Sequence, residues 1–464
     1  MRGFNTLLFV LFALSANAAD GTVGTVSVQK GNNVSVNGEA PLSLTLDGKE
    51  HQGCQFLSKR APDESHEFTW KEVTTTRGGE LAEILGDQLR SVDSLVVKGN
   101  VNDKDFHAMW DASLYGYLSV INLKNAVLEN NAVPDTAFFH ENEQYEGSSH
   151  EIFYYIGLRK IILPEGLEKI GEGAFYQASA LRQVNFPSTL RYIGDFAFNA
   201  TKLEMNQLVI PEGVEEINQY AFAFCRKLKA QVTLPSTIKK IGEWAFYGCP
   251  ITSINLPEGL ESLGSLAFWD CDLREVSIPS SCHEFNEGWQ FGFNRNLEKM
   301  HLPEGMTEIP DHFAVDCFRL REVNFPHTLK HIGEKAFSLC ISLKNVELPL
   351  GMQSLGEEAF SELEALEQIV FPASMKSLGK NSCSYWKNIK RIYCAAMEPP
   401  VCDPTDGGVF SGYDFPDGLN TPVVYVPKGT INKYKDTSRN CMGWEKFWNY
   451  VEIDPSEFPT TAID

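Results

Sequence analysis

Short segments of alternating apolar and polar residues return along this chain at a nearly constant interval. Each segment ends at a proline, and successive prolines are 22 to 24 residues apart. They stand at positions 164, 187, 211, 235, 257, 279, 303, 326, 349 and 372. Alternation with a period of two predicts a strand with one buried face. Proline ends the strand because it lacks an N–H group and fixes φ. The constant period predicts a solenoid of stacked repeats.

One repeat has the frame L-x-x-V/I-x-L/F-P-x-x-L/M-x-x-I/L-G-x-x-A-F-x-x-C, as in LREVNFPHTLKHIGEKAF from Leu320. A second short extended stretch follows the proline and ends at the glycine. Asn218 and Asn286 replace that glycine in two repeats, and asparagine tolerates positive φ better than most residues. We therefore expect a left-handed turn in this column, built differently at Pro310. The glycines of the column are Gly171, Gly194, Gly242, Gly264, Gly333, Gly356 and Gly379.

The Ala-Phe pair of each repeat is predicted to face inward. A single repeat cannot bury its own apolar edge, whereas stacked repeats share one continuous core. The phenylalanines should therefore form an internal spine, and core packing explains this column better than any ligand does. Its members are Phe175, Phe198, Phe222, Phe246, Phe268, Phe337 and Phe360.

Less regular repeats extend the array at both ends. Strands are predicted at 92–97, 118–123 and 389–394, where the proline is missing. The expected fold is a repeat solenoid that is mainly β with irregular or short helical turns. It has leucine-rich repeats of ~23 residues, about 12 units, and caps at both ends.

Five segments follow from this pattern: a leader at 1–19, a β-rich lead-in at 20–72, a cap with irregular repeats at 73–157, regular repeats at 158–394 and a terminal cap at 395–464. The lead-in contains alternating runs at Thr25–Gln29 and Val34–Val36, and residues 79–85 are typical of a short helix. The polar stretch at 140–151 is predicted to be an inserted loop, with a functional or an idle role. Four aromatic residues should seal the last repeat: Tyr434, Trp444, Phe447 and Trp448.

The first 19 residues carry Arg2, an apolar run through Leu14 and the small residues of Ser15–Ala19. This is the pattern of a secretory signal peptide, with cleavage expected after Ala18 or Ala19. No other apolar stretch approaches the length that spans a membrane. We predict a secreted, extracellular or cell-surface protein, with the periplasm as the alternative.

Charge and cysteine usage narrow the possible partners. Without Arg2 the chain has 39 basic and 61 acidic residues, or 39 − 61 = −22. This balance disfavours nucleic acid as a partner, because phosphate contacts need clustered Lys and Arg.

One repeat column holds cysteine in five repeats, at Cys225, Cys249, Cys271, Cys317 and Cys340, and Asn294 occupies the same column in a sixth. A column that accepts Cys and Asn indicates small buried hydrogen-bonding residues rather than disulfides. One disulfide among Cys394, Cys402 and Cys441 stays open, and Cys54 and Cys282 have no obvious partner.

No catalytic or metal-binding motif is evident, so we expect neither an enzyme nor a cofactor. His327 and His331 flank a turn and a strand, where helical ligand spacing does not apply. Asp103 and Asp105 precede a predicted helical turn at 106–110, and helix capping explains them better than calcium does. Asp403, Asp406 and Gly407 could form a calcium loop or an ordinary turn.

The exposed face of the strand array remains as the candidate site. In L-x-x-V-x-L the x residues point away from the core, toward an expected concave surface of mixed charge. Such a surface suits a protein or glycan, although any solvated strand face looks similar. The candidate partner-binding residues are Asn185, Thr233, Asn255, Ser277, Arg274, His301, Lys299, Asn324, Arg321, Glu347 and Lys344. Four residues break the polar column toward the ends and either extend a binding patch or touch the caps: Ile162, Val209, Val370 and Tyr393.

The repeat resembles that of the BspA-like leucine-rich-repeat family, which is common on surface and secreted proteins of Bacteroidetes. LPEGLEKIGEGAF from Leu163 and LPSTIKKIGEWAF from Leu234 carry the likeness, and it covers roughly residues 158–394. The resemblance implies an adhesin-like protein, expected as a monomer, that binds a protein or glycan on a host or bacterial surface through the concave face. An envelope-associated scaffold without a specific ligand is the alternative. A hydrolase with a hidden site is disfavoured.

Overall fold

The computed structural model describes residues 67–139, 156–402, 408–412, 421–436 and 443–459, together with four strands between residues 24 and 52. The described chain forms two compact units. The first comprises Met1–Met205 with Phe224–Lys227, and the second comprises Asn206–Ala223 with Leu228–Asp464. The predicted signal peptide, the loop at 140–151, Cys54, Cys441 and the Asp403–Gly407 turn lie outside the described residues.

The two alternating runs of the lead-in lie in strands, as predicted. They belong to a four-stranded sheet of order β2-β1-β3-β4, in which the β1–β2 and β3–β4 pairs are antiparallel and the β1–β3 pair is parallel. The strands are β1 (Gly24–Gln29), β2 (Asn33–Gly38), β3 (Ser43–Leu46) and β4 (Lys49–Gln52).

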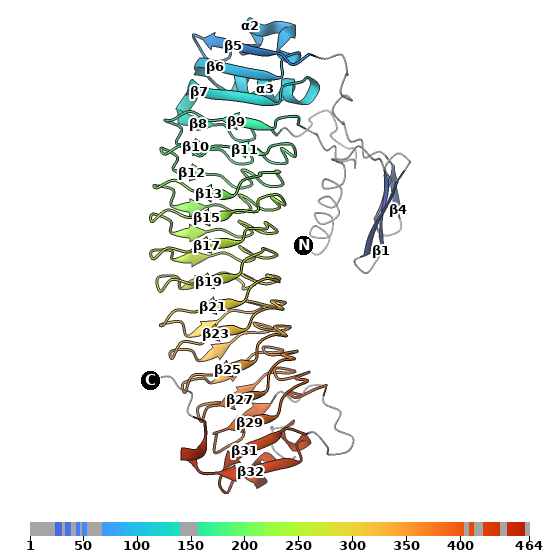
Figure 1. Ribbon diagram of the computed structural model, residues 1–464, viewed down its shortest axis with the longest axis vertical. Coiled ribbons are helices and arrows are strands. Elements are labelled where there is room, and N and C mark those ends of the chain that lie inside the picture. The colour runs from blue at the N-terminus through green and yellow to red at the C-terminus, as the bar shows by residue number, and fades with distance from the viewer. Residues whose placement is uncertain are drawn as a thin grey trace. The chain divides into compact units, whose positions relative to one another are not determined.

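Each unit is a parallel β-solenoid in which every regular turn contributes two short strands (Figure 1). The first strand is the alternating segment before the proline, and the second is the stretch before the glycine. In the first unit the first strands pair in the order β11-β9-β7-β6-β5, and β8, β10 and β12 form a second parallel ladder. Its strands are β5 (Trp70–Thr75), β6 (Ser94–Val101), β7 (Val120–Leu128), β8 (Ala132–Val133), β9 (Lys160–Ile162), β10 (Lys169–Ile170), β11 (Gln183–Val184) and β12 (Tyr192–Ile193).

The second unit repeats this arrangement. Its first strands form the ladders β13-β15-β17, β19-β21-β23 and β25-β27-β29-β31-β32, and its second strands are the even-numbered elements β14 to β30. The first strands are β13 (Gln207–Val209), β15 (Gln231–Thr233), β17 (Ser253–Asn255), β19 (Glu275–Ser277), β21 (Lys299–His301), β23 (Glu322–Asn324), β25 (Asn345–Glu347), β27 (Gln368–Phe371), β29 (Arg391–Cys394), β31 (Val423–Pro427) and β32 (Asn449–Ile453). The second strands are β14 (Glu216–Ile217), β16 (Lys240–Ile241), β18 (Ser262–Leu263), β20 (Glu284–Phe285), β22 (Glu308–Ile309), β24 (His331–Ile332), β26 (Ser354–Leu355), β28 (Ser377–Leu378) and β30 (Val401–Cys402).

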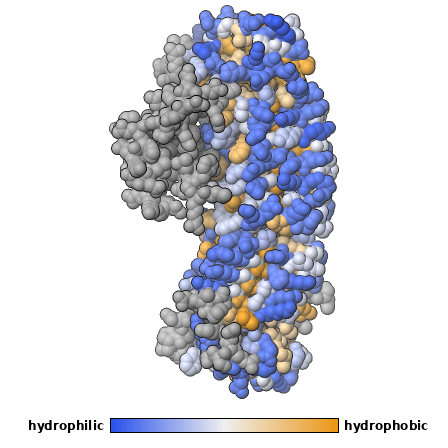
Figure 2. Space-filling view, turned by 180° about the vertical axis from the view of Figure 1, so that it is seen from behind, coloured by the Kyte–Doolittle hydropathy of each residue, from blue (hydrophilic) through white to orange (hydrophobic). Residues whose placement is uncertain are grey.

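The predicted solenoid is confirmed, with about 15 turns where we expected about 12. Strands β5, β31 and β32 continue the parallel ladders beyond the predicted repeats. The alternating sequence Val423–Val426 predicts the strand that β31 contains, whereas β5 and β32 are recognised only from the strand pairing. Figure 2 shows one side of the molecule, on which hydrophilic side chains dominate and hydrophobic ones lie between them.

The phenylalanine spine is confirmed, since all seven predicted rings are fully buried. In the first unit Phe138, Phe175 and Phe198 stack with centroid distances of 5.3 and 5.2 Å. In the second unit Phe222, Phe246 and Phe268 stack at 5.3 and 5.6 Å. Parallel stacking follows from the solenoid, because identical positions of successive turns lie directly above one another.

The spine changes in the turn that begins at Pro310, where the Ala-Phe pair is reversed. Ala314 takes the spine position, and Phe313 lies edge-on to Phe291 at 5.4 Å. The ring of Phe325 contacts the edges of Phe337 and Phe360, at 5.6 and 6.3 Å. Phe325, which directly follows β23, thus packs against the spine rings of the two turns that come after Ala314.

The thiols of the cysteine column donate hydrogen bonds to backbone carbonyl oxygens of the spine residues, as expected for a buried column of hydrogen-bonding side chains. Each thiol lies 2.9–3.3 Å from a backbone carbonyl oxygen of the preceding turn. Asn294 donates Nδ2 to Phe268 O at 2.7 Å, and Trp386 donates Nε1 to Phe360 O at 2.6 Å. Cysteine, asparagine and tryptophan share a side-chain donor, which explains why this column accepts all three.

All cysteines of the described part of the chain are free and buried, including Cys394 and Cys402. A disulfide that joins Cys394 or Cys402 to another described cysteine is therefore excluded. Burial raises the pKa of Cys317 to about 12 and that of Cys394 to about 11. Thiols that stay protonated at neutral pH are poor nucleophiles, so these side chains serve packing rather than chemistry.

The glycine column contradicts our expectation. None of its glycines has positive φ, and neither Asn218 nor Asn286 does. A Cβ on Gly264 would lie 2.4 Å from the backbone nitrogen of Glu243, and one on Gly356 would lie 2.6 Å from that of Glu334. Glycine is present because successive turns approach closely at this corner. Pro310 is accordingly no exception, since the column does not need a left-handed conformation.

The left-handed residues lie two positions further along each turn, directly before the Ala-Phe pair. They include Phe196, Tyr220, Trp244 and Leu266, with φ between 55° and 57°. A second left-handed residue follows two positions after the spine phenylalanine, for example Asp270 with φ 55°. Bulky residues at positive φ are uncommon, so sequence patterns alone gave no reason to expect them there.

Consecutive turns are also linked in pairs, a feature that our sequence analysis missed. Pro-Glu-Gly alternates with Pro-Ser-Thr or a close variant, so the full period is two turns. The Glu165 carboxylate accepts hydrogen bonds from the Ser188 N–H and hydroxyl, at 3.2 and 3.1 Å. The Thr189 hydroxyl accepts from the Gly166 N–H and donates to Leu167 O. The pairs Glu212–Ser236, Glu258–Ser280 and Glu304–His327 repeat the first contact.

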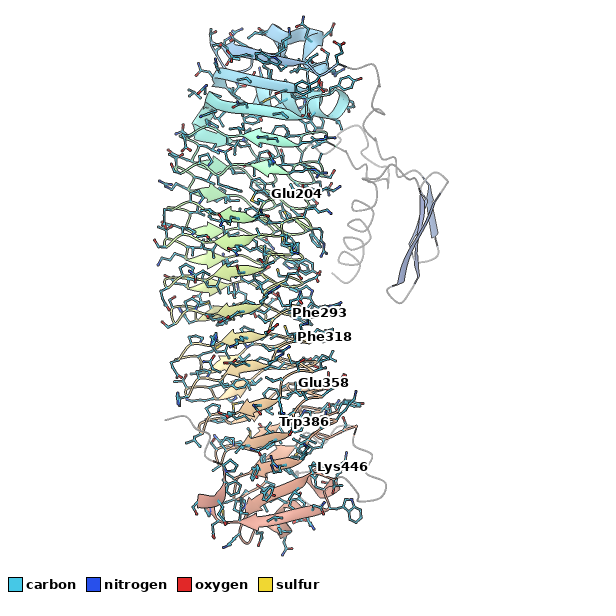
Figure 3. All side chains as sticks on the ribbon, in the orientation of Figure 1. Glu204, Phe293, Phe318, Glu358, Trp386 and Lys446 are labelled. Atoms are coloured by element: carbon cyan, nitrogen blue, oxygen red, sulfur yellow. The ribbon has the colours of Figure 1, made fainter. Side chains whose placement is uncertain are left out.

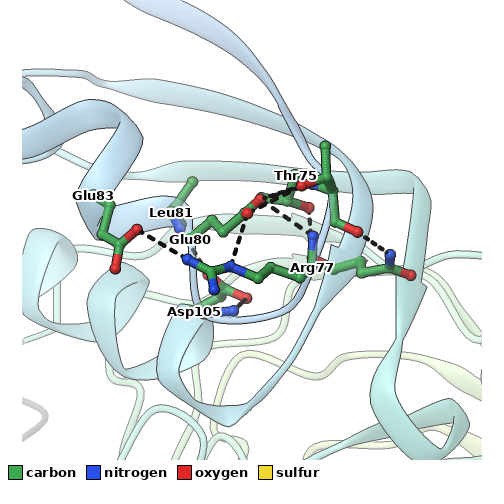
Figure 4. Close-up of polar contacts among 9 residues, drawn as sticks. Thr75, Arg77, Glu80, Leu81, Glu83 and Asp105 are labelled. Atoms are coloured by element: carbon green, nitrogen blue, oxygen red, sulfur yellow. Dashed lines mark hydrogen bonds and ion pairs between the residues drawn. The ribbon is translucent and has the colours of Figure 1, made fainter.

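Two helices close the N-terminal end of the first unit, α2 (Leu81–Leu85) and α3 (Asp103–Tyr115), with short 3-10 segments at Gly86–Arg90 and Glu129–Asn131. Helix α2 confirms the helix predicted at 79–85. Asp105 is buried, and its carboxylate accepts hydrogen bonds from the N–H groups of Gly79 and Asn102 at 2.7 and 3.0 Å. It also accepts one from the N–H of Leu81 at 2.9 Å (Figure 4). The N-cap of α3 is Asn102, and Asp105 completes its capping box while it also fixes the start of α2. The capping interpretation is thus confirmed for Asp105, whereas Asp103 is the first residue of the helix.

The C-terminal part of the second unit contains helix α4 (Ile431–Tyr434) and 3-10 segments at Trp444–Lys446 and Pro455–Glu457. Tyr434, Trp444 and Phe447 are buried, as predicted for residues that seal the end. Trp448 is 71% exposed, so our expectation for this residue was wrong. It lies next to β32, outside the buried cluster.

Candidate functional site

The described residues contain no group of His, Cys, Asp or Glu that could hold a metal ion. His327 and His331 have separate partners: Nδ1 of His327 lies 2.9 Å from Glu304 Oε1, and Nδ1 of His331 lies 2.6 Å from Ser354 Oγ. Within the described part of the chain, no helix is long and apolar enough to cross a membrane. The exposed face of the first strands is the surface left to consider.

This first-strand face consists of the outward side chains of strands β13 to β29 in the second unit and of the residue before each strand. Parallel pairing places equivalent residues in columns. Glu275, Lys299 and Glu322 are in register, and so are Ser277, His301 and Asn324. Nearly all the predicted site residues are exposed, and His301 is partly buried. Asn185 lies in the first unit and the other ten lie in the second.

Two of the predicted residues have structural roles. Asn185 Oδ1 accepts a hydrogen bond from the Leu163 N–H at 2.7 Å, and Asn185 Nδ2 donates to Leu163 O at 3.0 Å. Asn324 makes the same pair of bonds with Leu302, at 2.9 and 3.0 Å. Each side-chain amide thus mimics a backbone amide and extends the parallel ladder by one step. These two residues are poor probes of binding, because substituting them also breaks contacts between turns.

Most charges on the first-strand face are paired within it. Lys299 Nζ lies 3.1 Å from Glu322 Oε2, and His301 Nε2 lies 3.3 Å from Glu275 Oε1. Lys344 Nζ is 3.1 Å from Glu367 Oε1, and these contacts with Lys344 and Lys390 lower the pKa of Glu367. Exposed pairs of this kind contribute little stability.

Arg274 and Arg321 differ from these paired residues. Both are exposed, and neither forms an ion pair with another described residue. They occupy equivalent positions two turns apart, on either side of Glu298. An arginine offers five donors in a planar arrangement that matches carboxylates. Among the predicted basic residues of the face, only these two form no ion pair with another described residue.

The four apolar residues that interrupt the polar column of the first strands lie in different environments. Tyr393 stacks on Tyr425 at 4.4 Å and contacts Phe458 edge-on at 6.4 Å, so it touches the terminal segment. Val370 is buried, whereas Val209 is 54% exposed. Ile162 in the first unit is partly buried. The second of the two predicted roles, contact with a cap, therefore holds for Tyr393.

Aromatic residues on the turns were not recognised in the sequence. Tyr220, Trp244 and Trp289 stand directly before the inward-facing pair of their turns, at the left-handed position. The signal that could have identified them is an aromatic residue in a column that elsewhere holds Gly173, Lys335 or Glu358.

His312 belongs to this aromatic group and lies in an unusual environment. Its ring stacks on Trp289 with a centroid distance of 3.6 Å, and its Nδ1 has no hydrogen-bond partner among the described residues. Burial lowers the pKa of His312, and Lys335 adds to this effect. Glu334, Asp311 and Glu358 oppose it, with Glu334 Oε1 3.7 Å from Nε2.

We therefore predict that His312 makes stability depend on pH. The folded chain holds this imidazole neutral, whereas the unfolded chain protonates it near an ordinary pKa of about 6.5. Its contribution is present above that value and is lost as pH falls toward the lowered pKa of the folded state. Urea midpoints at pH 7.5 and 5.0 should thus differ less for His312→Gln than for the native chain.

His283→Gln is the control for this prediction. His283 is exposed, and its Nδ1 lies 2.7 Å from Ser281 O. The pH dependence of this variant should equal that of the native chain. An unchanged pH dependence in His312→Gln would show that other groups are responsible.

The regular repeats of this chain match a known protein family. Residues 148–231, 230–330 and 310–397 match the model of the BspA type leucine-rich repeat region, with six copies. These matches cover more than half of the chain. The chain belongs to the BspA type leucine-rich repeat family. No curated protein matches it.

Several solved structures are similar to this BspA type chain. A leucine-rich repeat protein from Bacteroides ovatus is 20% identical, with 80% of this chain and 93% of the other covered and a TM-score of 0.41. A leucine rich cell surface protein from Faecalibacterium prausnitzii is 20% identical, with 61% and 84% covered and a TM-score of 0.33. The pneumococcal vaccine antigen PcpA is 17% identical, with 93% and 99% covered and a TM-score of 0.37. Because these TM-scores are below 0.5, family membership rests on the sequence match alone.

Leucine-rich repeat solenoids are typically non-enzymatic scaffolds. The coarse role that follows is protein interaction or adhesion.

Proposed function

We propose that this chain is a secreted or cell-surface protein that binds a protein or glycan on a host or bacterial surface through its first-strand face. The observation that carries the proposal is the pair of exposed arginines, Arg274 and Arg321, which form no ion pair with any described residue, whereas the other basic residues predicted on this face are paired. The rigid ladder beneath them fixes their spacing, which lowers the cost of ordering on binding.

The proposed location rests on the N-terminal sequence. Residues 1–19 have the pattern of a signal peptide, and one similar protein is described as a cell surface protein. Protease treatment of intact cells should cleave a surface-located chain, whereas a periplasmic chain should stay intact until the outer membrane is opened. Retention of the full chain in the cytoplasm would contradict the proposal.

A scaffold without a specific ligand is the second candidate. The ion pairs of Lys299, His301 and Lys344 favour it, because charges that satisfy one another leave less for a partner. The binding protein and the scaffold differ in which side chains of the first-strand face they require. A binding face needs Arg274 and Arg321, whereas a scaffold does not.

The test is a binding screen of the full chain against arrayed matrix proteins and glycans at physiological salt. For each ligand found, we expect Arg274→Glu/Arg321→Glu to weaken binding by about tenfold or more, because buried charge contacts at interfaces cost about 2–5 kcal/mol when one partner is lost. Lys330→Glu/Lys376→Glu is the control with the same change of charge, on exposed residues beside the second strands. Equal binding by both variants would remove the first-strand face from consideration. No binding by the native chain would favour the scaffold.

A further inference from the structure

The second unit carries a set of aromatic side chains on its turns, away from the first strands. We define the aromatic turn surface as the partly exposed residues Tyr220, Trp244, Trp269, Trp289, Phe293 and His312. They come from five consecutive turns, and two groups of contacts connect them. Tyr220 stacks on Trp244 at 5.2 Å, and Trp269 contacts Trp289 at 5.2 Å and Phe293 at 4.4 Å.

The backbone at Gly292 leaves space for the indole ring of Trp269, which belongs to this surface. A Cβ on Gly292 would lie 2.1 Å from Cζ3 and 2.5 Å from Cε3 of Trp269. The indole of Trp269 therefore lies directly against the backbone at Gly292, in a space that any other residue would fill. Adjacent turns hold Trp269 and Val315 at the position of Gly292. A glycine in that column is needed for the placement of the indole rather than for the fold of the turn.

The charge around the aromatic residues has one sign. The turn segments 218–223, 242–248, 264–270, 286–293 and 310–316 contain no Lys or Arg. They contain five acidic residues, all at least partly exposed: Glu243, Asp270, Glu287, Asp311 and Asp316. The first-strand face in the same region is balanced, with Arg274, Lys299 and Arg321 against Glu275, Glu298 and Glu322. Within these turn segments the charged side chains are therefore all acidic, and they lie in the same turns as the aromatic rings.

A cation already occupies the edge of this surface. The guanidinium carbon of Arg295 lies 5.7 Å from the ring centroid of Phe293 and 5.7 Å from that of Phe318. These two phenylalanines lie on the same side of the second unit (Figure 3). Arg295 also acts on the carboxylate of Asp316. The chain itself thus provides one example of a basic side chain that contacts two aromatic rings and also offsets part of the rise that burial causes in the pKa of a carboxylate.

We propose that the aromatic turn surface binds a Lys- and Arg-rich segment of another protein. The long apolar stems of these residues cover aromatic rings while their charged ends reach nearby carboxylates. Tryptophan and tyrosine are also the residues that most often dominate binding at protein interfaces. This surface is separate from the first-strand face, and its role does not depend on the function proposed above.

The probe for this proposal is a fluorescein-labelled decalysine peptide, with a decaglutamate peptide as the negative control. Binding to the full chain is followed by fluorescence anisotropy at physiological salt. The Trp244→Leu/Trp269→Leu variant keeps every charge, and we expect it to bind decalysine about fivefold or more weakly. Trp448→Leu removes a tryptophan that is 71% exposed outside the surface, and its binding should match the native chain.

A second variant keeps the proposal testable if the double tryptophan variant does not fold. Glu243→Gln/Glu287→Gln removes two carboxylates with little change of shape, and it should weaken decalysine binding by about threefold. Equal decalysine affinity in the native chain and the tryptophan variant would mean attraction by net charge alone, and the proposal would fail. Binding of cellohexaose, a neutral sugar, in place of decalysine with the same dependence on tryptophan would overturn it in favour of a glycan.

Discussion

Phe246→Ala is expected to lower the free energy of unfolding by about 3–5 kcal/mol, the usual range for truncating a buried phenylalanine. The ring is fully buried and lies between Phe222 at 5.3 Å and Phe268 at 5.6 Å. Its removal leaves a cavity inside a column whose members cannot move together, because each is fixed by its own turn. Chemical denaturation followed by circular dichroism and by tryptophan fluorescence measures the change.

Trp448→Ala is the matched control, since it truncates an aromatic residue that is 71% exposed. We expect its stability to lie within about 0.5 kcal/mol of the native value. A loss below about 1 kcal/mol for Phe246→Ala would mean that neighbouring turns collapse into the space. Disagreement between the two probes would mean that parts of the solenoid unfold separately.

Gly264→Ala is expected to have the second largest effect, with a loss of about 1–3 kcal/mol from overpacking. The new methyl group would lie 2.4 Å from Glu243 N and 2.5 Å from Gly242 C. These are backbone atoms of the preceding turn, so no side chain can move aside to relieve the contact. The two turns must separate, which also disturbs the pairing of β16 with β18. Thermal unfolding of the purified chain measures the loss.

Gly351→Ala separates this effect from a general cost of replacing glycine. A Cβ on Gly351 would meet its nearest atoms at 3.8 and 4.0 Å, and its φ is not positive. We expect this variant to be neutral or more stable by about 0.4–1 kcal/mol, because alanine restricts the unfolded chain. If both alanine variants were equally stable, close approach between turns would not explain the glycine column.

Much of the fold could be predicted from the sequence because equivalent positions in successive turns must meet the same packing requirements. A position that must be apolar in one turn must be apolar in the next, so Phe246 is recognised as core from its equivalents alone. Ten repeats also showed that the cysteine column tolerates Asn294, which indicated a buried donor before any bond was known. The alternation of Pro-Glu-Gly with Pro-Ser-Thr was equally visible, although its meaning required the hydrogen bonds between Glu165 and Ser188.

The candidate site was predicted less completely. Alternation along a strand identifies which side chains face outward, and nearly all eleven predicted residues are indeed exposed. It does not tell which of them are used within the fold. Asn185 and Asn324 bond to the backbone of the preceding turn, and Lys299 pairs with Glu322. Arg274 and Arg321 stand out only after these contacts have been assigned.

What the sequence determined by itself is the period, the strands, the spine and the polar column, because each depends on position within one turn. The tertiary structure decided everything that depends on contact between turns. It changed the role of the glycine column from backbone conformation to close approach, and it brought Trp269 against Gly292 and Trp289. The physical reason is that residues more than 20 positions apart become neighbours only through the register of the stacked strands, and the distance between neighbouring atoms decides which side chains fit.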